Sequence, residues 1–83
     1  MNIKVLGPGC AKCRSLGKTV KEAVAALKLD IKVEEIKDIK EIMKYSILMT
    51  PGLVINEKVV MSGKVPSKAE IERLIMSALD DQD

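Results

Sequence analysis

The 83-residue chain contains no histidine, phenylalanine or tryptophan, and its single aromatic residue is Tyr45. Proteins that bind single-stranded nucleic acid usually stack the bases on aromatic side chains, so we do not expect a nucleic-acid partner. A structural zinc site needs four cysteine or histidine ligands, and the chain offers only two cysteines. No apolar run reaches the roughly 20 residues that span a bilayer, and no signal peptide is evident. These absences predict a cytoplasmic protein with no membrane association.

What the chain does contain is typical of a small globular domain. Hydrophobic residues make up 47% of the sequence and charged residues 31%, and aliphatic side chains must supply the core because aromatic ones are lacking. The formal net charge of +2 is too small to imply a polyanionic partner. We predict one domain over residues 1–83, ending in a short acidic tail at residues 80–83. We also expect a monomer.

The hydrophobic pattern predicts a strand, helix, strand, helix, strand, strand and helix in that order. Apolar residues alternate in the expected strands and recur every three or four positions in the expected helices. Two predicted capping boxes, Asp38 with Glu41 and Ser67 with Glu70, begin the second and third helices. The predicted strands span 2–6, 29–36, 53–56 and 58–62, and the predicted helices span 10 to about 28, 39 to about 46, and 68 to about 79.

This order of elements predicts an α/β fold. The first two strands are joined by a helix, so they should lie parallel with a right-handed crossover. The last two strands flank a turn at Asn56 and Glu57, so they should form an antiparallel hairpin. We therefore predict a four-stranded mixed sheet with helices on both faces.

Cys10 and Cys13 lie at the start of the first predicted helix, shortly after the first predicted strand ends. The helix N-terminus favours an anion, and Lys12 and Arg14 add positive charge, so the position favours the reactive thiolate of Cys10. Cys13 is one helical turn further on and belongs to the buried stripe of the helix. A disulfide between them would close too small a loop to stabilise the fold much. The pattern predicts Cys10 as an exposed nucleophile and Cys13 as a shielded resolving thiol.

Two other interpretations of the cysteine pair stay open at this point. The pair could be inert, or it could bind a soft metal or metalloid such as Cu(I) through two thiolates. Ferredoxin-like copper chaperones also place two cysteines at this spacing between a first strand and a first helix. However, that fold has the order βαββαβ and ends in a strand, and it typically carries Met where this chain has Pro8. We rank redox chemistry above metal binding.

The sequence resembles the thioredoxin superfamily, specifically its small thioredoxin- or glutaredoxin-like redox-active disulfide proteins. The resemblance depends on Cys10-Ala11-Lys12-Cys13 after the first strand and on Thr50-Pro51 before the hairpin. It implies that Pro51 is a cis-proline against the disulfide and that Thr50 contacts an extended substrate. Gly9 and Lys12 are further predicted substrate-binding residues.

The same resemblance implies the chemistry and its partners. The protein would reduce or exchange disulfides of protein or small-molecule substrates through its two cysteines, with no bound cofactor and no metal. Its electrons would come from a reductase or from glutathione.

The chain also departs from the family. Pro8, Gly9, Ala11 and Lys12 stand where the family often has an aromatic residue near the first cysteine and Pro, Gly or Tyr between the two. We find no match to the buried carboxylate that aids proton transfer in typical thioredoxins.

Two helix faces carry rows of cations, Arg14, Lys18 and Lys21 on the first helix and Lys37, Lys40 and Lys44 on the second. Such rows are usually solvated faces, and the alternative is a docking site for an acidic partner or glutathione.

Overall fold

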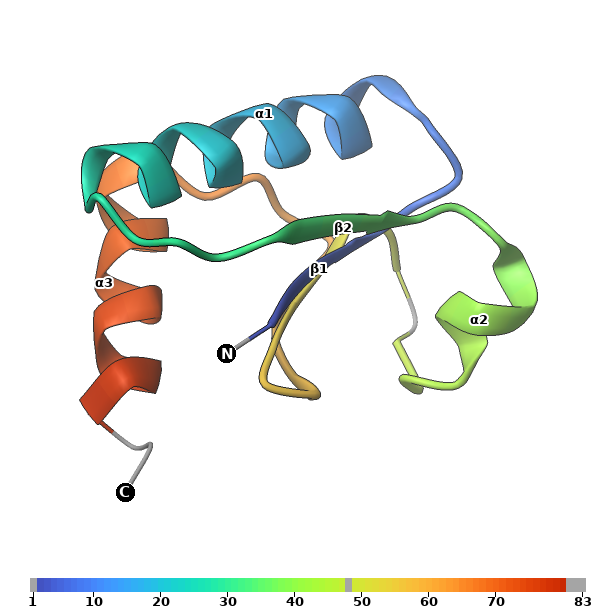
Figure 1. Ribbon diagram of the computed structural model, residues 1–83. Coiled ribbons are helices and arrows are strands. Elements are labelled where there is room, and N and C mark those ends of the chain that lie inside the picture. Colours follow the sequence, from blue (N-terminus) through green and yellow to red (C-terminus); the bar gives the residue numbers. More distant parts are fainter. Residues whose placement is uncertain (1, 48, 81–83) are drawn as a thin grey trace.

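The structure, a computed structural model that describes residues 2–47 and 49–80, has the predicted order βαβαββα (Figure 1). It therefore confirms the α/β fold with a four-stranded mixed sheet and three helices. The strands are β1 (Ile3–Leu6), β2 (Val33–Ile36), β3 (Gly52–Ile55) and β4 (Lys58–Ser62), and the helices are α1 (Ala11–Ala26), α2 (Ile39–Met43) and α3 (Lys68–Asp80).

The strands lie in the order β2-β1-β3-β4. β1 is parallel to β2 and antiparallel to β3, which pairs with β4 in the predicted hairpin. Leu6, the last residue of β1, lies opposite Gly52, the first residue of β3, and Gly52 lies opposite Ser62, the last residue of β4. The segments that follow β1, precede β3 and follow β4 therefore all leave the sheet at one end.

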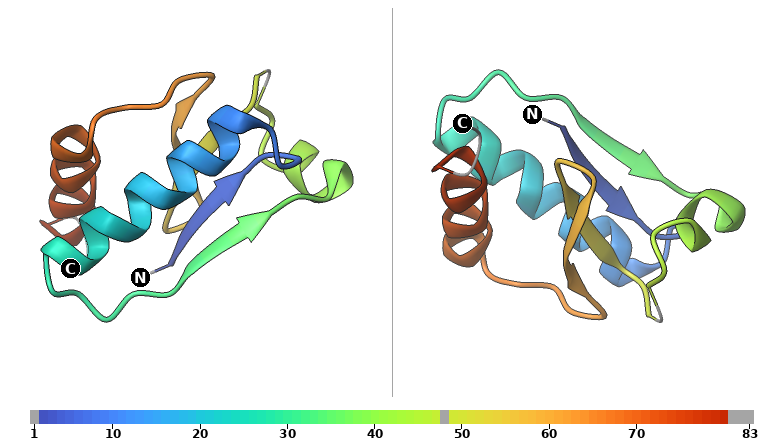
Figure 2. Two further views of the ribbon diagram at one scale, coloured as in Figure 1. Left: turned by 90° about the horizontal axis from the view of Figure 1, so that it is seen from above. Right: turned by 90° about the horizontal axis from the view of Figure 1, so that it is seen from below.

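Helices cover both faces of the sheet, as predicted. α1 lies across one face, and α3 runs crosswise to it and packs against it (Figures 1 and 2). Ile71 and Ile75 hold α3 in place because both are fully buried, each contributing about 1.5–3 kcal/mol of hydrophobic stabilisation. The core on this face contains ten buried residues, Ile3, Val5, Leu16, Val20, Ala23, Val24, Leu53, Ile55, Ile71 and Ile75.

α2 covers the opposite face with a much smaller core. There Ile42 of α2 packs with Leu6 of β1 and Val54 of β3. Three half-buried residues complete this second cluster, Ile36, Tyr45 and Ile47. The two faces therefore contribute very unequally to the hydrophobic stability of the fold.

The backbone conformation of Asn56 and Glu57 accounts for the hairpin turn. Asn56 and Glu57 have φ angles of 54° and 67°, the positive values that a two-residue type I′ turn needs at both positions. The register then shifts between Leu53 and Val54, which leaves Val60 of β4 without a direct partner. This β-bulge lies on an edge strand, where bulges discourage pairing with another chain.

Several predicted boundaries were wrong. β2 begins at Val33 rather than residue 29, and Leu29 and Ile31 pack on the core as part of the connection. α2 ends at Met43, three residues early, and a turn continues to Ser46, whose φ is 57°. Asp80 is the last residue of α3 rather than part of a tail, and residues 81–83 lie outside the described residues.

A polar cluster that the sequence analysis missed ties the hairpin turn to the face covered by α2. Lys4 Nζ donates to Glu57 Oε1 at 2.8 Å and to Tyr45 Oη at 2.9 Å, while Tyr45 Oη donates to Glu57 Oε2 at 3.0 Å. The hydrogen bond between Lys4 and Glu57 is the main cause that lowers the pKa of the Glu57 carboxyl and raises the pKa of the Lys4 ammonium. Tyr45 shifts both pKa values in the same directions.

We expect Glu57→Gln to lower the melting temperature at neutral pH. We also expect the melting temperature of this variant to fall less than that of the wild type as the pH is lowered. A carboxyl whose pKa is lower in the folded chain stabilises the fold above its usual pKa of 4.5, and that contribution is lost as the pH falls through the folded value. Thermal melts between about pH 3 and about pH 7 measure both effects.

Glu41→Gln is the matched control, because among the described residues Glu41 forms its ion pair only with exposed Lys44, next to the end of the same helix. If the melting temperatures of the wild type and of Glu57→Gln fall equally steeply as the pH is lowered, this account of the cluster is contradicted.

Candidate functional site

Three chain segments meet at the end of the sheet identified above. Residues 7–10 follow β1, Thr50 and Pro51 precede β3, and Gly63 follows β4. Because Leu6 lies opposite Gly52, Gly7 and Pro51 leave the sheet from adjacent positions. The Gly63 N–H donates to the Pro51 carbonyl at 2.8 Å, which fixes the third segment to the second. The fold thus brings the two motifs of the sequence, 40 residues apart, to one place.

Cys10 and Cys13 form a disulfide, with their Cα atoms 5.0 Å apart. Cys10 is the N-cap of α1, and its Sγ accepts a hydrogen bond from the Cys13 backbone N–H at 3.3 Å. Cys10 is exposed, whereas Cys13 is only 4% exposed on the buried stripe of α1. The difference in exposure is the one that the sequence predicts for an attacking and a resolving sulfur.

The charges around Cys10 favour a negative sulfur. The first turn of α1 contains no acidic residue, and Lys12 and Arg14 lie exposed within it. The Cys13 N–H and the positive end of the helix dipole add to these cations, and a reduced Cys10 would meet the same groups. This arrangement stabilises a thiolate at Cys10 relative to a cysteine in open solvent.

Gly7 is a site residue that the sequence analysis did not identify. It is buried, and a Cβ placed on it would lie 2.8 Å from Cys13 Cβ and closer still to Cys13 Sγ. Its N–H donates to the Ile36 carbonyl at 2.9 Å, so the backbone cannot easily retreat. Only glycine leaves room for Cys13 at this position. The signal available in the sequence was a glycine directly after the strand that leads to the cysteines.

The other predicted site residues take different positions around the same end of the sheet. Pro51 is buried and the Thr50–Pro51 peptide bond is cis, while Thr50 is half-buried. Gly9 has a φ of 103°, a backbone conformation that side chains disfavour, and Lys12 is exposed beside the cysteines. Their roles in substrate binding stay predictions.

Residues 2–47 and 49–80 contain no group of three or more His, Cys, Asp or Glu side chains arranged as a metal site. None of the described helices is long and apolar enough to cross a membrane.

Residues 1–76 match the family model described as a thioredoxin domain. The chain belongs to the thioredoxin family. A protein named thioredoxin from Methanothermobacter thermautotrophicus is 36% identical over 75 residues, which cover 90% of this chain and 97% of the relative. A second protein named thioredoxin, from Methanocaldococcus jannaschii, is 35% identical over 78 residues, or 94% of this chain and 90% of the relative.

A third relative, named probable thioredoxin, comes from Archaeoglobus fulgidus and is 36% identical over 73 residues, which cover 82% of this chain and 77% of the relative. All three matches extend well beyond the cysteine motif. Family membership and the Cys10–Cys13 disulfide together make this thioredoxin-family chain a thiol–disulfide oxidoreductase.

Proposed function

We propose that the protein is a thioredoxin-type reductase of protein disulfides that receives its electrons from a dedicated reductase. The observation that carries the proposal is the exposed Cys10 at the start of α1, bonded to the buried Cys13. The names of the relatives favour thioredoxin-type over glutaredoxin-type coupling. We propose a cytoplasmic setting, where a reducing pool keeps the pair in its dithiol form.

The first chemical step is attack by the Cys10 thiolate on one sulfur of the substrate disulfide. The Cys10–substrate S–S bond forms as the substrate's own S–S bond breaks, and the second substrate sulfur leaves as a thiolate that takes a proton from water. The Cys13 N–H that bonds Cys10 Sγ and the cations of the first turn stabilise the attacking anion. The product is a mixed disulfide.

The second step releases the substrate. Cys13 gives its proton to water and its thiolate attacks Cys10 Sγ. The Cys10–Cys13 bond forms as the bond between Cys10 and the substrate breaks, and the remaining substrate sulfur leaves as a thiolate that takes a proton from water. Two electrons have then passed from the Cys10–Cys13 dithiol to the substrate. In the resulting disulfide the two Cα atoms lie 5.0 Å apart, within the usual range for such a bond.

The substrate itself would lie along the segment before β3. In the proposal, Thr50 offers backbone groups to an extended substrate segment beside Pro51, and Gly9 and Lys12 border the same surface. Thr50 is half-buried and Lys12 is exposed, so both can be reached from solvent.

An equilibrium redox titration of the purified protein tests the proposal. The protein is equilibrated in graded thiol/disulfide buffers, quenched with an alkylating reagent and weighed by mass spectrometry. We expect a reversible two-electron transition between roughly −180 and −270 mV, with a midpoint near −270 mV for thioredoxin-type coupling. The absence of any intramolecular Cys10–Cys13 disulfide across the titration would overturn the proposal.

A further inference from the structure

A row of cations runs along α1 from the nucleophile. Arg14, Lys18 and Lys21, named here the basic ridge, follow Cys10 at intervals of four, four and three residues. Such intervals place side chains on one face of a helix, so the ridge begins at Cys10 itself. At 1.5 Å of rise per residue, Lys21 stands about 16 Å along the helix from Cys10.

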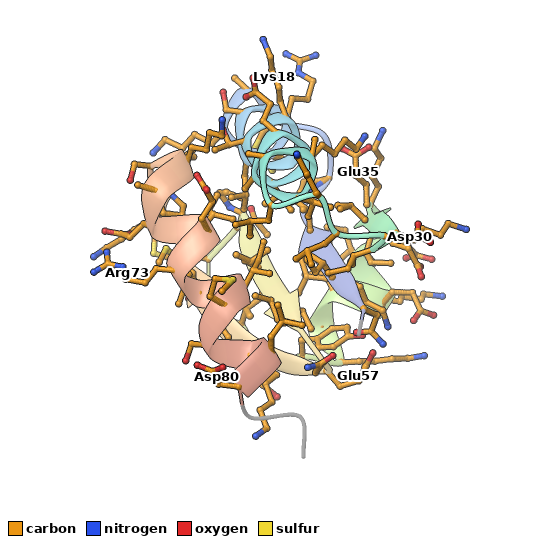
Figure 3. The ribbon with its side chains drawn as sticks, turned by 60° about the vertical axis from the view of Figure 1, so that its left-hand side comes forward. Lys18, Asp30, Glu35, Glu57, Arg73 and Asp80 are labelled. Carbon is orange, nitrogen blue, oxygen red and sulfur yellow. A yellow bond between two sulfur atoms is a disulfide. The ribbon has the colours of Figure 1, made fainter. Side chains whose placement is uncertain are left out.

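The ridge is open to solvent beside the edge strand β2. All three of its residues are exposed, and Figure 3 shows Lys18 projecting from α1 away from the sheet while Glu35 lies beside the helix. The ridge residues border a shallow hollow of about 440 Å³, completed by Glu22, Ala25 and Glu35. The surface can therefore receive a chain segment without moving any helix or strand.

Most of the ridge charge is uncompensated. Lys21 Nζ lies 3.7 Å from Glu35 Oε2, but Arg14 and Lys18 have no carboxylate within 4.0 Å among the described residues. The charge is also concentrated, because residues 1–28 hold six of the 14 basic residues and one of the 12 acidic ones. This part of the chain has a net charge of +5, and the remainder has −3.

The placement of the cations opposes the stability of α1. Its first turn contains Lys12 and Arg14 but no acidic residue, and cations near a helix N-terminus destabilise the helix through its dipole. Where a natural protein breaks a local rule of this kind, the place is often a functional site. Stabilisation of the Cys10 thiolate explains the cations of the first turn, but Lys18 and Lys21 are too far along the helix for that role.

We propose that the basic ridge docks an acidic segment of the protein that exchanges its disulfide with Cys10. This inference rests on the proposed function and names the chemistry of its partner. A length of about 16 Å matches roughly five extended residues, which is longer than a glutathione tripeptide. Three cations without an aromatic side chain form a poor nucleic-acid surface. Opposite charges would steer the partner and raise the association rate, by about tenfold or more at low salt.

Two synthetic peptides with the same disulfide test the docking, one flanked by five acidic residues and one by five uncharged serines. The second-order rate constant of reduction is measured for each at about 20 mM and about 500 mM salt. We expect the acidic peptide to react about tenfold faster than the serine peptide at low salt, with the ratio falling toward one at high salt. Taking the ratio removes any change in the reactivity of Cys10 itself.

The triple variant Arg14→Gln/Lys18→Gln/Lys21→Gln should lose this preference. Its matched control is Lys32→Gln/Lys58→Gln/Lys68→Gln, which removes the same charge from exposed positions off α1 and should keep the preference. Equal rates for the two peptides, or an equal loss in the control variant, would overturn the docking alone. Failure to reduce either peptide would overturn the proposed function, and the docking with it.

Discussion

Cys10→Ser is expected to abolish disulfide reduction, with a fall in rate of roughly a thousandfold or more. A serine hydroxyl stays protonated at neutral pH and cannot replace the thiolate that attacks the substrate, and no other cysteine is exposed in its place. The buried Cys13 is only 4% exposed and cannot take over the attack. Reduction of the uncharged serine peptide, followed by mass spectrometry, measures the loss directly.

The partner variant Cys13→Ser should behave differently. The attack by Cys10 remains, but no thiol is left to resolve the product, so a covalent adduct between Cys10 and the peptide should accumulate to one per protein. Peptide mapping locates the adduct, and circular dichroism of both variants shows that the fold is kept. An adduct on Cys13 of Cys10→Ser, or full turnover by that variant, would show that the two roles are reversed.

The different exposure of the two cysteines could be predicted from the sequence because it depends on local spacing. Cys10 ends the segment after the first strand, and Cys13 joins Leu16 and Val20 on the apolar stripe, so their different exposure follows from helical periodicity alone. The order of strands and helices was predictable for the same reason. The hairpin could be predicted from two apolar runs that flank Asn56 and Glu57. These two residues adopt the positive φ angles of the turn.

The misplaced boundaries reflect tertiary pairing, which no local pattern contains. The alternation of Leu29, Ile31 and Val33 predicted a long second strand, but β1 offers only the four residues from Ile3 to Leu6 as partners. Leu29 and Ile31 still bury apolar surface. The pattern therefore predicted their burial correctly, but it was wrong to place them in a hydrogen-bonded strand. The second helix stopped early because its last turn tightens into i to i+3 bonds, one of them from Tyr45 to Ile42.

Contacts between residues far apart in the chain were also beyond the sequence. Lys4, Tyr45 and Glu57 are separated by up to 53 residues, and nothing in their local patterns indicates that they meet. Gly7 is only six residues from Cys13, but their contact exists because the segment after β1 turns back over the start of α1. Sequence analysis therefore identified the disulfide pair and missed the packing around Cys13.

Gly7→Ala is expected to lower the free energy of unfolding by about 1–3 kcal/mol, and more in the oxidised protein than in the reduced one. The added methyl group would lie 2.8 Å from Cys13 Cβ and would overlap Cys13 Sγ. The disulfide fixes that sulfur in place, whereas a free thiol can rotate away from the new methyl group. The oxidised form is therefore penalised more, and the midpoint potential should become less negative by about 20–60 mV, since 30 mV corresponds to about 1.4 kcal/mol.

Denaturant unfolding of the oxidised and the reduced forms, together with the redox titration, measures both quantities and checks them against each other. If the unfolded chain has the same potential in both proteins, the difference between the two stability losses must equal the shift in potential. Gly9→Ala is the control, because its Cβ would meet nothing within 4 Å but its φ of 103° imposes backbone strain. Strain of that kind should destabilise both redox forms alike and leave the potential unchanged. Equal losses in both forms of Gly7→Ala would mean that Gly7 serves only the fold, because its contact with Cys13 would then have no influence on the redox chemistry.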